Sequence, residues 1–204
     1  MKLNEMVISN HEAGMQDALE ATEKLGEDCG LGKKQILHLR LLAEELFGMT
    51  RSIAGKAEGQ YWVEQEGSRF EIHFNSEVDM TKEKHKRFID VSTSGENAAA
   101  KGFMGKLRNM IALSMLPKEE RASMLSMGLI PMDSPSGTST ENVDFMWSMN
   151  QYKSTVNQNR STNEQAKEAW DELEKSIVSS LADEVIVHIV GSLVDITIIK
   201  TVKD

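Results

Sequence analysis

The chain has 204 residues, with 23 Lys and Arg against 32 Asp and Glu, so its formal net charge at pH 7 is −9. This length suits one domain with a core of its own, and 40% apolar with 27% charged residues is the balance of a folded protein. The acidic charge argues against nucleic acid as the main partner, because phosphate binding needs clustered Lys and Arg. No apolar run reaches the roughly 18 residues of a membrane-spanning helix. The chain starts without a signal-peptide pattern and has a single cysteine, Cys29, so we expect a cytoplasmic protein with no membrane partner.

The first part of the chain predicts two helices. Ser9 and Glu12 have the spacing of a capping box, and the helix that follows them should be closed by Gly26 and the glycines after it. Over residues 33–54, apolar side chains recur three and four positions apart, which predicts a second, longer helix that ends before Gly55.

The next segments predict a hairpin and a third helix. Residues 61–63 and 70–74 are rich in strand-forming types, and Gly67 and Ser68 between them suit a tight turn. Apolar and polar residues alternate in the second run, so one face of that strand should be buried. A third long helix is expected over about 99–115.

The remainder of the chain predicts an insertion, a helix and a closing hairpin. All three prolines fall in an insertion at about 117–160, in which residues 143–149 are typical of a strand. A helix is expected over about 162–182. Two β-rich runs, 185–190 and 193–202, then flank a Gly-Ser pair and predict a second hairpin.

Helices and hairpins are segregated along the chain, which favours an α+β fold. We expect a two-layer α/β sandwich in which an antiparallel or mixed sheet carries its helices on one face. The chain should form a single domain over 1–204 that contains the insertion at about 117–160.

Common catalytic and metal-binding motifs are absent from the sequence. The five histidines are scattered and there is no cysteine pair, so no metal site is expected. The sequence also contains no G-x-S-x-G, no Walker loop and no G-x-G-x-x-G, which removes the motifs of hydrolases, P-loop proteins and Rossmann folds.

Two segments carry the candidate site, and the first is LLAEELFGMTRSI (41–53). It places two carboxylates, Glu44 and Glu45, on the second helix among apolar neighbours. The plainest interpretation is that at least one of them is a solvated surface residue.

The second segment is KGFMGKLRNMI (101–111). Gly102 and Gly105 form a turn that opens a helix, with Lys106 beside it. A glycine-rich helix N-terminus offers unpaired N–H groups and the positive end of the helix dipole, which suits a phosphate. The alternative is that the two glycines only allow close packing of the helix.

In this order, the segments resemble the histidine-kinase-like ATPase (GHKL or Bergerat) family, in particular its anti-sigma-factor serine-kinase branch. The resemblance covers roughly residues 9–116 and 183–202. In that family a helix carries Glu-x-x-x-Asn, a hairpin ends in Asp-x-Gly, a mobile lid follows, and a glycine turn begins the next helix. The closing hairpin there often begins with Ala-Asp-x-Val, as residues 182–185 do here.

The resemblance implies a Bergerat-type fold with ATP as its ligand, and it assigns roles to individual residues. Glu45 takes the place of the family carboxylate that polarises water or a hydroxyl. The positions that would contact the nucleotide are Met49, Asn75, Gly102, Gly105 and Lys106.

Two of these positions depart from the family pattern. Where the family has the Asn that binds Mg²⁺, this chain has Met49, whose thioether is a poor ligand for a hard cation. The adenine-reading Asp aligns with Asn75, or in an alternative alignment with Asp79, and a neutral amide makes a weaker bond. The resemblance therefore implies ATP but argues against Mg²⁺. It also requires Glu45, Asn75 and Gly102 to line one hollow between the helices and the sheet.

The leading hypothesis is a divergent member of this family that has lost magnesium-dependent catalysis. It would act as a nucleotide-binding or purely protein-binding regulator, with a regulatory protein as partner. The first alternative is an active ATP-binding serine kinase with Glu45 as its general base. The second is a structural interaction protein with no nucleotide site, and an unrelated α+β domain with the same element order also stays open. The insertion could cover a pocket, extend the sheet or form the face of a homodimer.

Overall fold

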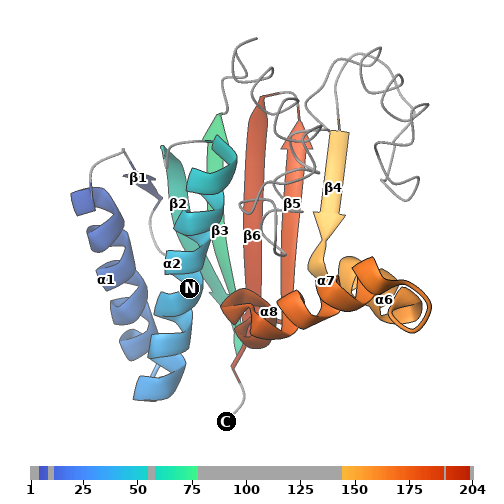
Figure 1. Cartoon of the computed structure of the whole chain (residues 1–204). Helices are drawn as coiled ribbons and strands as arrows, with labels where there is room; N and C mark the ends of the chain where they lie inside the picture. Colours follow the sequence, from blue (N-terminus) through green and yellow to red (C-terminus); the bar gives the residue numbers. More distant parts are fainter. Residues whose placement is uncertain (1–4, 9–11, 55–57, 78–143, 191, 203–204) are drawn as a thin grey trace.

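The computed structural model describes residues 5–8, 12–54, 58–77, 144–190 and 192–202. These residues form a six-stranded sheet with helices against one of its faces (Figure 1). The strand order is β1-β2-β3-β6-β5-β4, and every pair of neighbouring strands is antiparallel. The predicted α+β class is confirmed, and the arrangement is compatible with a two-layer sandwich.

The closing hairpin lies in the middle of this sheet, where β6 pairs with β3. The strands are β1 (Met6–Ile8), β2 (Gly59–Glu66), β3 (Arg69–Glu77), β4 (Asp144–Ser148), β5 (Glu184–Val190) and β6 (Leu193–Thr201). The helices are α1 (Glu12–Asp28), α2 (Lys33–Ala54), α6 (Met149–Asn159), α7 (Glu164–Lys175) and α8 (Ile177–Leu181). None of these helices has both the length and the apolarity that crossing a membrane requires.

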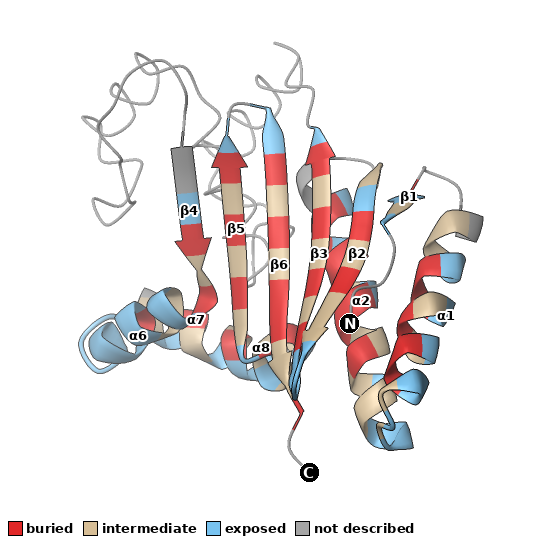
Figure 2. Cartoon of the chain, turned by 180° about the vertical axis from the view of Figure 1, so that it is seen from behind, coloured by how far each residue is buried: buried red, intermediate tan, exposed pale blue. Residues whose placement is uncertain are grey.

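The sheet has a buried face because its strands alternate apolar and polar side chains, and this alternation is visible as bands along the strands in Figure 2. The side chains on the face beneath the helices include Tyr61, Val63, Phe70, Ile72, Phe74, Val185, Val187, Ile189, Val194, Ile196 and Ile198. We call the opposite face, which carries the intervening residues, the open face.

Helix α2 packs on the centre of the buried face. Its buried side contains Leu39, Leu42, Ala43, Leu46, Phe47, Met49 and Thr50. The Phe47 ring lies 5.1 Å from the ring of Tyr61 and 5.8 Å from that of Phe74, measured between centroids. The hydroxyls of Tyr61 and Thr22 are 2.6 Å apart, so a buried hydrogen bond links β2 to α1.

Helix α1 extends past Gly26, the first of the glycines that were predicted to close it, and ends before Gly30. Gly26 lies inside α1, which ends at Asp28, and the left-handed residue after the helix is Gly30, with φ 74°. A Cβ atom at Gly26 would lie 3.0 Å from Cγ1 of Ile36. Gly26 therefore allows the last turn of α1 to approach α2 closely and does not terminate α1.

The helix predicted over 162–182 is two helices. The chain breaks at Ser176, whose Oγ accepts a hydrogen bond from the Ser179 amide and caps α8. The side-chain oxygen of Asn163 accepts a hydrogen bond from the amide of Ala166 in the first turn of α7.

Both predicted hairpins and the strand near 143–149 are confirmed, and Gly67 occupies the first turn with φ 57°. Two elements were not predicted. β1 is only three residues long, and α6 is almost entirely polar, with only Met149 and Val156 buried. The third helix predicted over about 99–115 lies outside the described residues.

Candidate functional site

The two carboxylates of α2 lie in different surroundings. Glu44 is exposed, and its Oε1 lies 3.0 Å from Nε of Arg40, which also pairs with Glu23 of α1 at 3.0 Å. Glu45 is half-buried, and burial, reinforced by the neighbouring charge of Glu44, raises the pKa of its carboxyl. Glu44 is therefore the solvated member of the pair, whereas Glu45 has the environment of a group that can exchange a proton nearer neutral pH.

Met49 follows Glu45 by one turn on the same side of α2, because residues four apart are neighbours on a helix. Its side chain is 1% exposed and belongs to the core. The hydroxyl of Thr50, the next residue, donates to the Leu46 carbonyl at 2.9 Å. Both side chains are therefore engaged within the core. Met49 packs against apolar residues, and Thr50 makes a hydrogen bond inside α2.

Asn75 lies on the open face of β3. Its neighbour Phe74 points toward α2, where its ring meets Phe47 edge-on at an interplanar angle of 86°. Because successive side chains of a strand point to opposite faces, the Asn75 side chain is directed away from α2. The structure therefore does not bring Glu45 and Asn75 together, and the hollow that they were expected to share is not formed by this pair.

Ser76 is the polar residue near the end of β3 that faces the helices. It is buried, and its Oγ donates to the carbonyl of Glu58 at 2.6 Å. The sequence contained the signal for this, since Phe70, Ile72 and Phe74 share the parity of Ser76. The family motif points instead to Asn75 as the adenine-binding residue, and Asn75 has the opposite parity.

The remaining candidates, Gly102, Gly105 and Lys106, lie outside the described residues, as does Asp79. In the part of the chain that the structure describes, no group of three or more His, Cys, Asp or Glu side chains could hold a metal ion.

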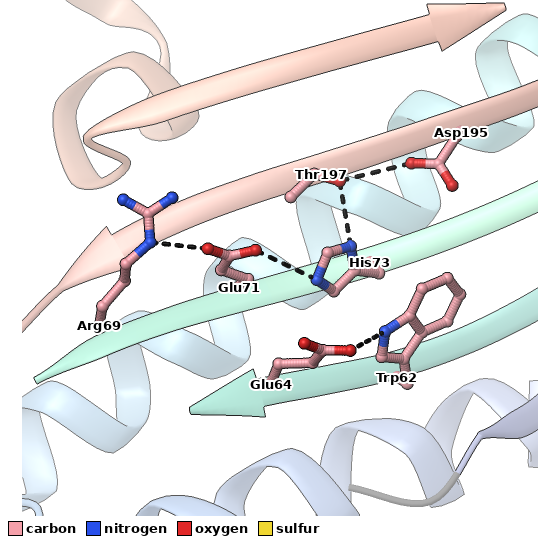
Figure 3. Close-up of polar contacts among 7 residues, drawn as sticks. All are labelled: Trp62, Glu64, Arg69, Glu71, His73, Asp195 and Thr197. Carbon is pink, nitrogen blue, oxygen red and sulfur yellow. Dashed lines mark hydrogen bonds and ion pairs between the residues drawn. The ribbon is translucent and has the colours of Figure 1, made fainter. Parts of the chain in front are cut away.

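A polar cluster on the open face was missed by the sequence analysis (Figure 3). We call it the open-face cluster; its members are Trp62, Glu64, Arg69, Glu71, His73, Asp195 and Thr197. The His73 ring stacks on Trp62, with centroids 4.7 Å apart and planes 6° from parallel. Nδ1 of His73 lies 3.0 Å from Thr197 Oγ1, and Nε2 lies 3.5 Å from Glu71 Oε2.

Further contacts extend this cluster across three strands. Arg69 Nε lies 2.6 Å from Glu71, Trp62 Nε1 donates to Glu64 at 3.1 Å, and the Thr197 hydroxyl lies 3.4 Å from Asp195. β3 and β6 were each predicted, and the polar residues two apart were visible in each. Their pairing was not predicted, because it joins residues more than one hundred positions apart.

The open-face cluster places a hydroxyl beside an imidazole and a carboxylate. The backbone around it, however, does not suit acyl transfer. That reaction needs free N–H donors aimed at the developing oxyanion. β3 and β6 are central strands paired along their length, from Arg69–Thr201 to Glu77–Leu193, which engages their backbone groups in the ladder. The geometry suits a recognition or structural surface better than a catalytic centre.

Comparison of the chain with known proteins adds no relative, since no protein-family model, no curated protein and no solved structure matches it.

Proposed function

We propose that this protein is a divergent histidine-kinase-like ATPase domain that has lost magnesium-dependent phosphoryl transfer and regulates another protein by direct contact. The proposal is supported by the order of elements, with α2 packed over the two hairpins and Glu45 half-buried on it. It takes the Bergerat-type arrangement as its working hypothesis for the fold.

The observation that carries the loss of catalysis is the burial of Met49. A side chain that is 1% exposed in an apolar core cannot present a ligand to a hydrated cation. Phosphoryl transfer depends on positioning and on neutralisation of the phosphates by the metal. Losing several kcal/mol of that stabilisation, at about 1.36 kcal/mol per tenfold in rate, slows the reaction on the order of a thousandfold or more.

Calorimetric titration with ATP and a non-hydrolysable analogue, each with and without Mg²⁺, tests the proposal. We expect no gain in affinity on adding Mg²⁺. Micromolar binding that depends on Mg²⁺ would contradict the inactive assignment.

One observation favours the alternative of an active serine kinase. The raised pKa of the Glu45 carboxyl brings it closer to the range of a useful general base. This alternative predicts phosphate release or phosphoprotein formation that Glu45→Gln abolishes and Glu44→Gln, its exposed neighbour, preserves. Absence of both activities in the unmodified protein removes its support.

Another observation favours a structural interaction protein without a nucleotide site. Glu45 and Asn75 lie on opposite sides of the sheet, so these two residues cannot form the expected pocket. In this case ATP and its analogue would fail to bind whether or not Mg²⁺ is present, while contact with a partner protein would persist.

A further inference from the structure

We infer that one corner of the open face binds a segment of a partner protein that has an apolar centre flanked by Lys or Arg. We call this surface the β4–β6 corner; it consists of Met146, Val190 and Leu193, with Glu77 and Asp195 at its rim. The inference rests on the protein-contact part of the proposed function and names the surface and the chemistry of the partner.

The β4–β6 corner gathers exposed apolar side chains that are scattered elsewhere. Met146 is 62% exposed, Val190 41% and Leu193 42%. The other exposed large apolar residues of the described chain lie singly on three different elements, and they are Val7 on β1, Leu37 on α2 and Ile177 on α8. Isolated apolar residues are normal on a surface, whereas a contiguous group marks an interaction site.

Strand register makes Val190 the neighbour of both Met146 and Leu193. Val190 and Leu193 are directly paired across the β5–β6 hairpin, and Met146 pairs with His188, two residues before Val190. Side chains in such diagonal positions are roughly 7–8 Å apart and within reach of one ligand. Alternation puts all three on the open face, since Trp147, Ile189 and Val194 beside them are buried on the helix side. Figure 2 shows the exposed ends of β5 and β6 at the same end of the sheet as the exposed band of β4.

The charge around the β4–β6 corner selects the partner. Glu77 is exposed and pairs in register with Leu193, and Asp195 follows on the same face two residues along β6. A second copy of this chain would bring its own acidic rim against this one, and each chain already has a net charge of −9. A segment with Lys or Arg beside its apolar residues complements the rim, so we assign the surface to a basic partner and not to a homodimer.

The test uses the full chain and two synthetic twelve-residue peptides, one of repeating Lys-Val-Lys-Leu and one of repeating Glu-Val-Glu-Leu. Binding is followed by fluorescence anisotropy of the labelled peptide at low and moderate salt. We expect the Lys peptide to bind and the Glu peptide not to bind. The triple variant Met146→Ser, Val190→Thr, Leu193→Thr should weaken the Lys peptide roughly tenfold or more.

The matched control replaces three apolar side chains elsewhere, through Val7→Thr, Leu37→Ser and Ile177→Ser, and these are 80%, 51% and 44% exposed. It should change the affinity less than about twofold. Glu77→Lys is a second variant whose result loss of folding cannot explain. It should weaken binding of the Lys peptide and create binding of the Glu peptide. Equal losses in both triple variants, or failure of the Lys peptide to bind, would overturn the inference. If light scattering shows a dimer that only the corner variant dissociates, the surface binds a second copy of the chain instead. None of these results depends on ATP, so the catalytic half of the proposed function is tested separately.

Discussion

The two faces of β3 carry different kinds of side chain, apolar on one and polar on the other. On one face Phe70, Ile72 and Phe74 are buried against the helices, and Phe74 meets the Phe47 ring of α2. On the other, residues from the same strand join side chains of β2 and β6 in a polar cluster. Strand β3 therefore supports the core with one set of residues and presents charges with the alternate set.

This difference explains why the expected site does not form as one unit. Glu45 belongs to the helix side and Asn75 to the open side, although the motif comparison placed them together. It also separates the effects of mutation, because residues on the helix side should determine stability while residues on the open face should affect recognition with little cost in folding.

The largest expected effect is that of Phe74→Ala, which should lower the free energy of unfolding by about 3–5 kcal/mol through lost burial and a cavity beside Phe47. The matched change on the other face of the same strand, Asn75→Ala, should cost less than about 1 kcal/mol. Urea unfolding followed by circular dichroism measures both. Similar losses in the two variants would erase the distinction between the faces.

The next effect concerns the position where the resemblance expects a metal ligand. Met49→Asn puts an amide into an apolar site and should cost about 2–4 kcal/mol of stability, without creating Mg²⁺-dependent ATP binding. Met49→Leu keeps the volume and should cost less than about 1.5 kcal/mol. Thermal unfolding measures the stability of both variants, and ATP titration with and without Mg²⁺ measures their nucleotide binding. Magnesium-dependent binding by the Asn variant would show that the site had only lost its ligand.

A smaller effect should appear at high pH on the helix side. Tyr152 lies beside Trp147, and burial, with the charge of Glu172, raises the pKa of Tyr152 to about 12. A raised pKa means that the folded state holds the proton more tightly, so this contribution is complete below about pH 10 and is lost as the pH rises toward 12. Because the Tyr152 ring is partly exposed, we expect this contribution to the free energy of unfolding to be roughly 1 kcal/mol.

Urea unfolding between pH 9 and 12 checks this expectation. Tyr152→Phe should flatten part of the alkaline decline in stability. The chain has only two tyrosines, and burial also raises the pKa of Tyr61, so Tyr61→Phe supplies the comparison. If the stability of the Tyr152→Phe variant falls with pH as steeply as that of the unmodified protein, other groups cause the alkaline decline.

The smallest expected effect lies on the open face. Arg69 and Glu71 form a contact of 2.6 Å, but the Arg69 side chain is 49% exposed. Exposed ion pairs contribute little, so Arg69→Gln should change the free energy of unfolding by less than about 0.5 kcal/mol. A loss of 2 kcal/mol or more in urea unfolding would show that the open-face cluster holds the fold together.

The elements that were predicted well are those with strong local signals. α2 spans the predicted range because its apolar side repeats without interruption over six turns, and both hairpins follow from strand-forming runs around glycine turns. β1 and α6 were missed for the opposite reason. Three residues are too few to show a period, and α6 has an almost wholly polar sequence that is held in place by contacts beyond itself, such as the Asn150 amide on the Glu184 carboxylate at 3.1 Å.

The sequence by itself determined the type of most elements and, through alternation, which residues of a strand share a face. It also identified Glu44 and Glu45 as candidates, because carboxylates among apolar neighbours are a local feature, while the choice of Glu45 came from the family resemblance. Only the tertiary structure decided which face the helices cover, and hence that Met49 packs in the core and that Asn75 points away from Glu45. It also decided that His73 meets Thr197. These outcomes depend on pairing between distant segments, where burial of apolar area selects one arrangement among many that local periodicity allows equally.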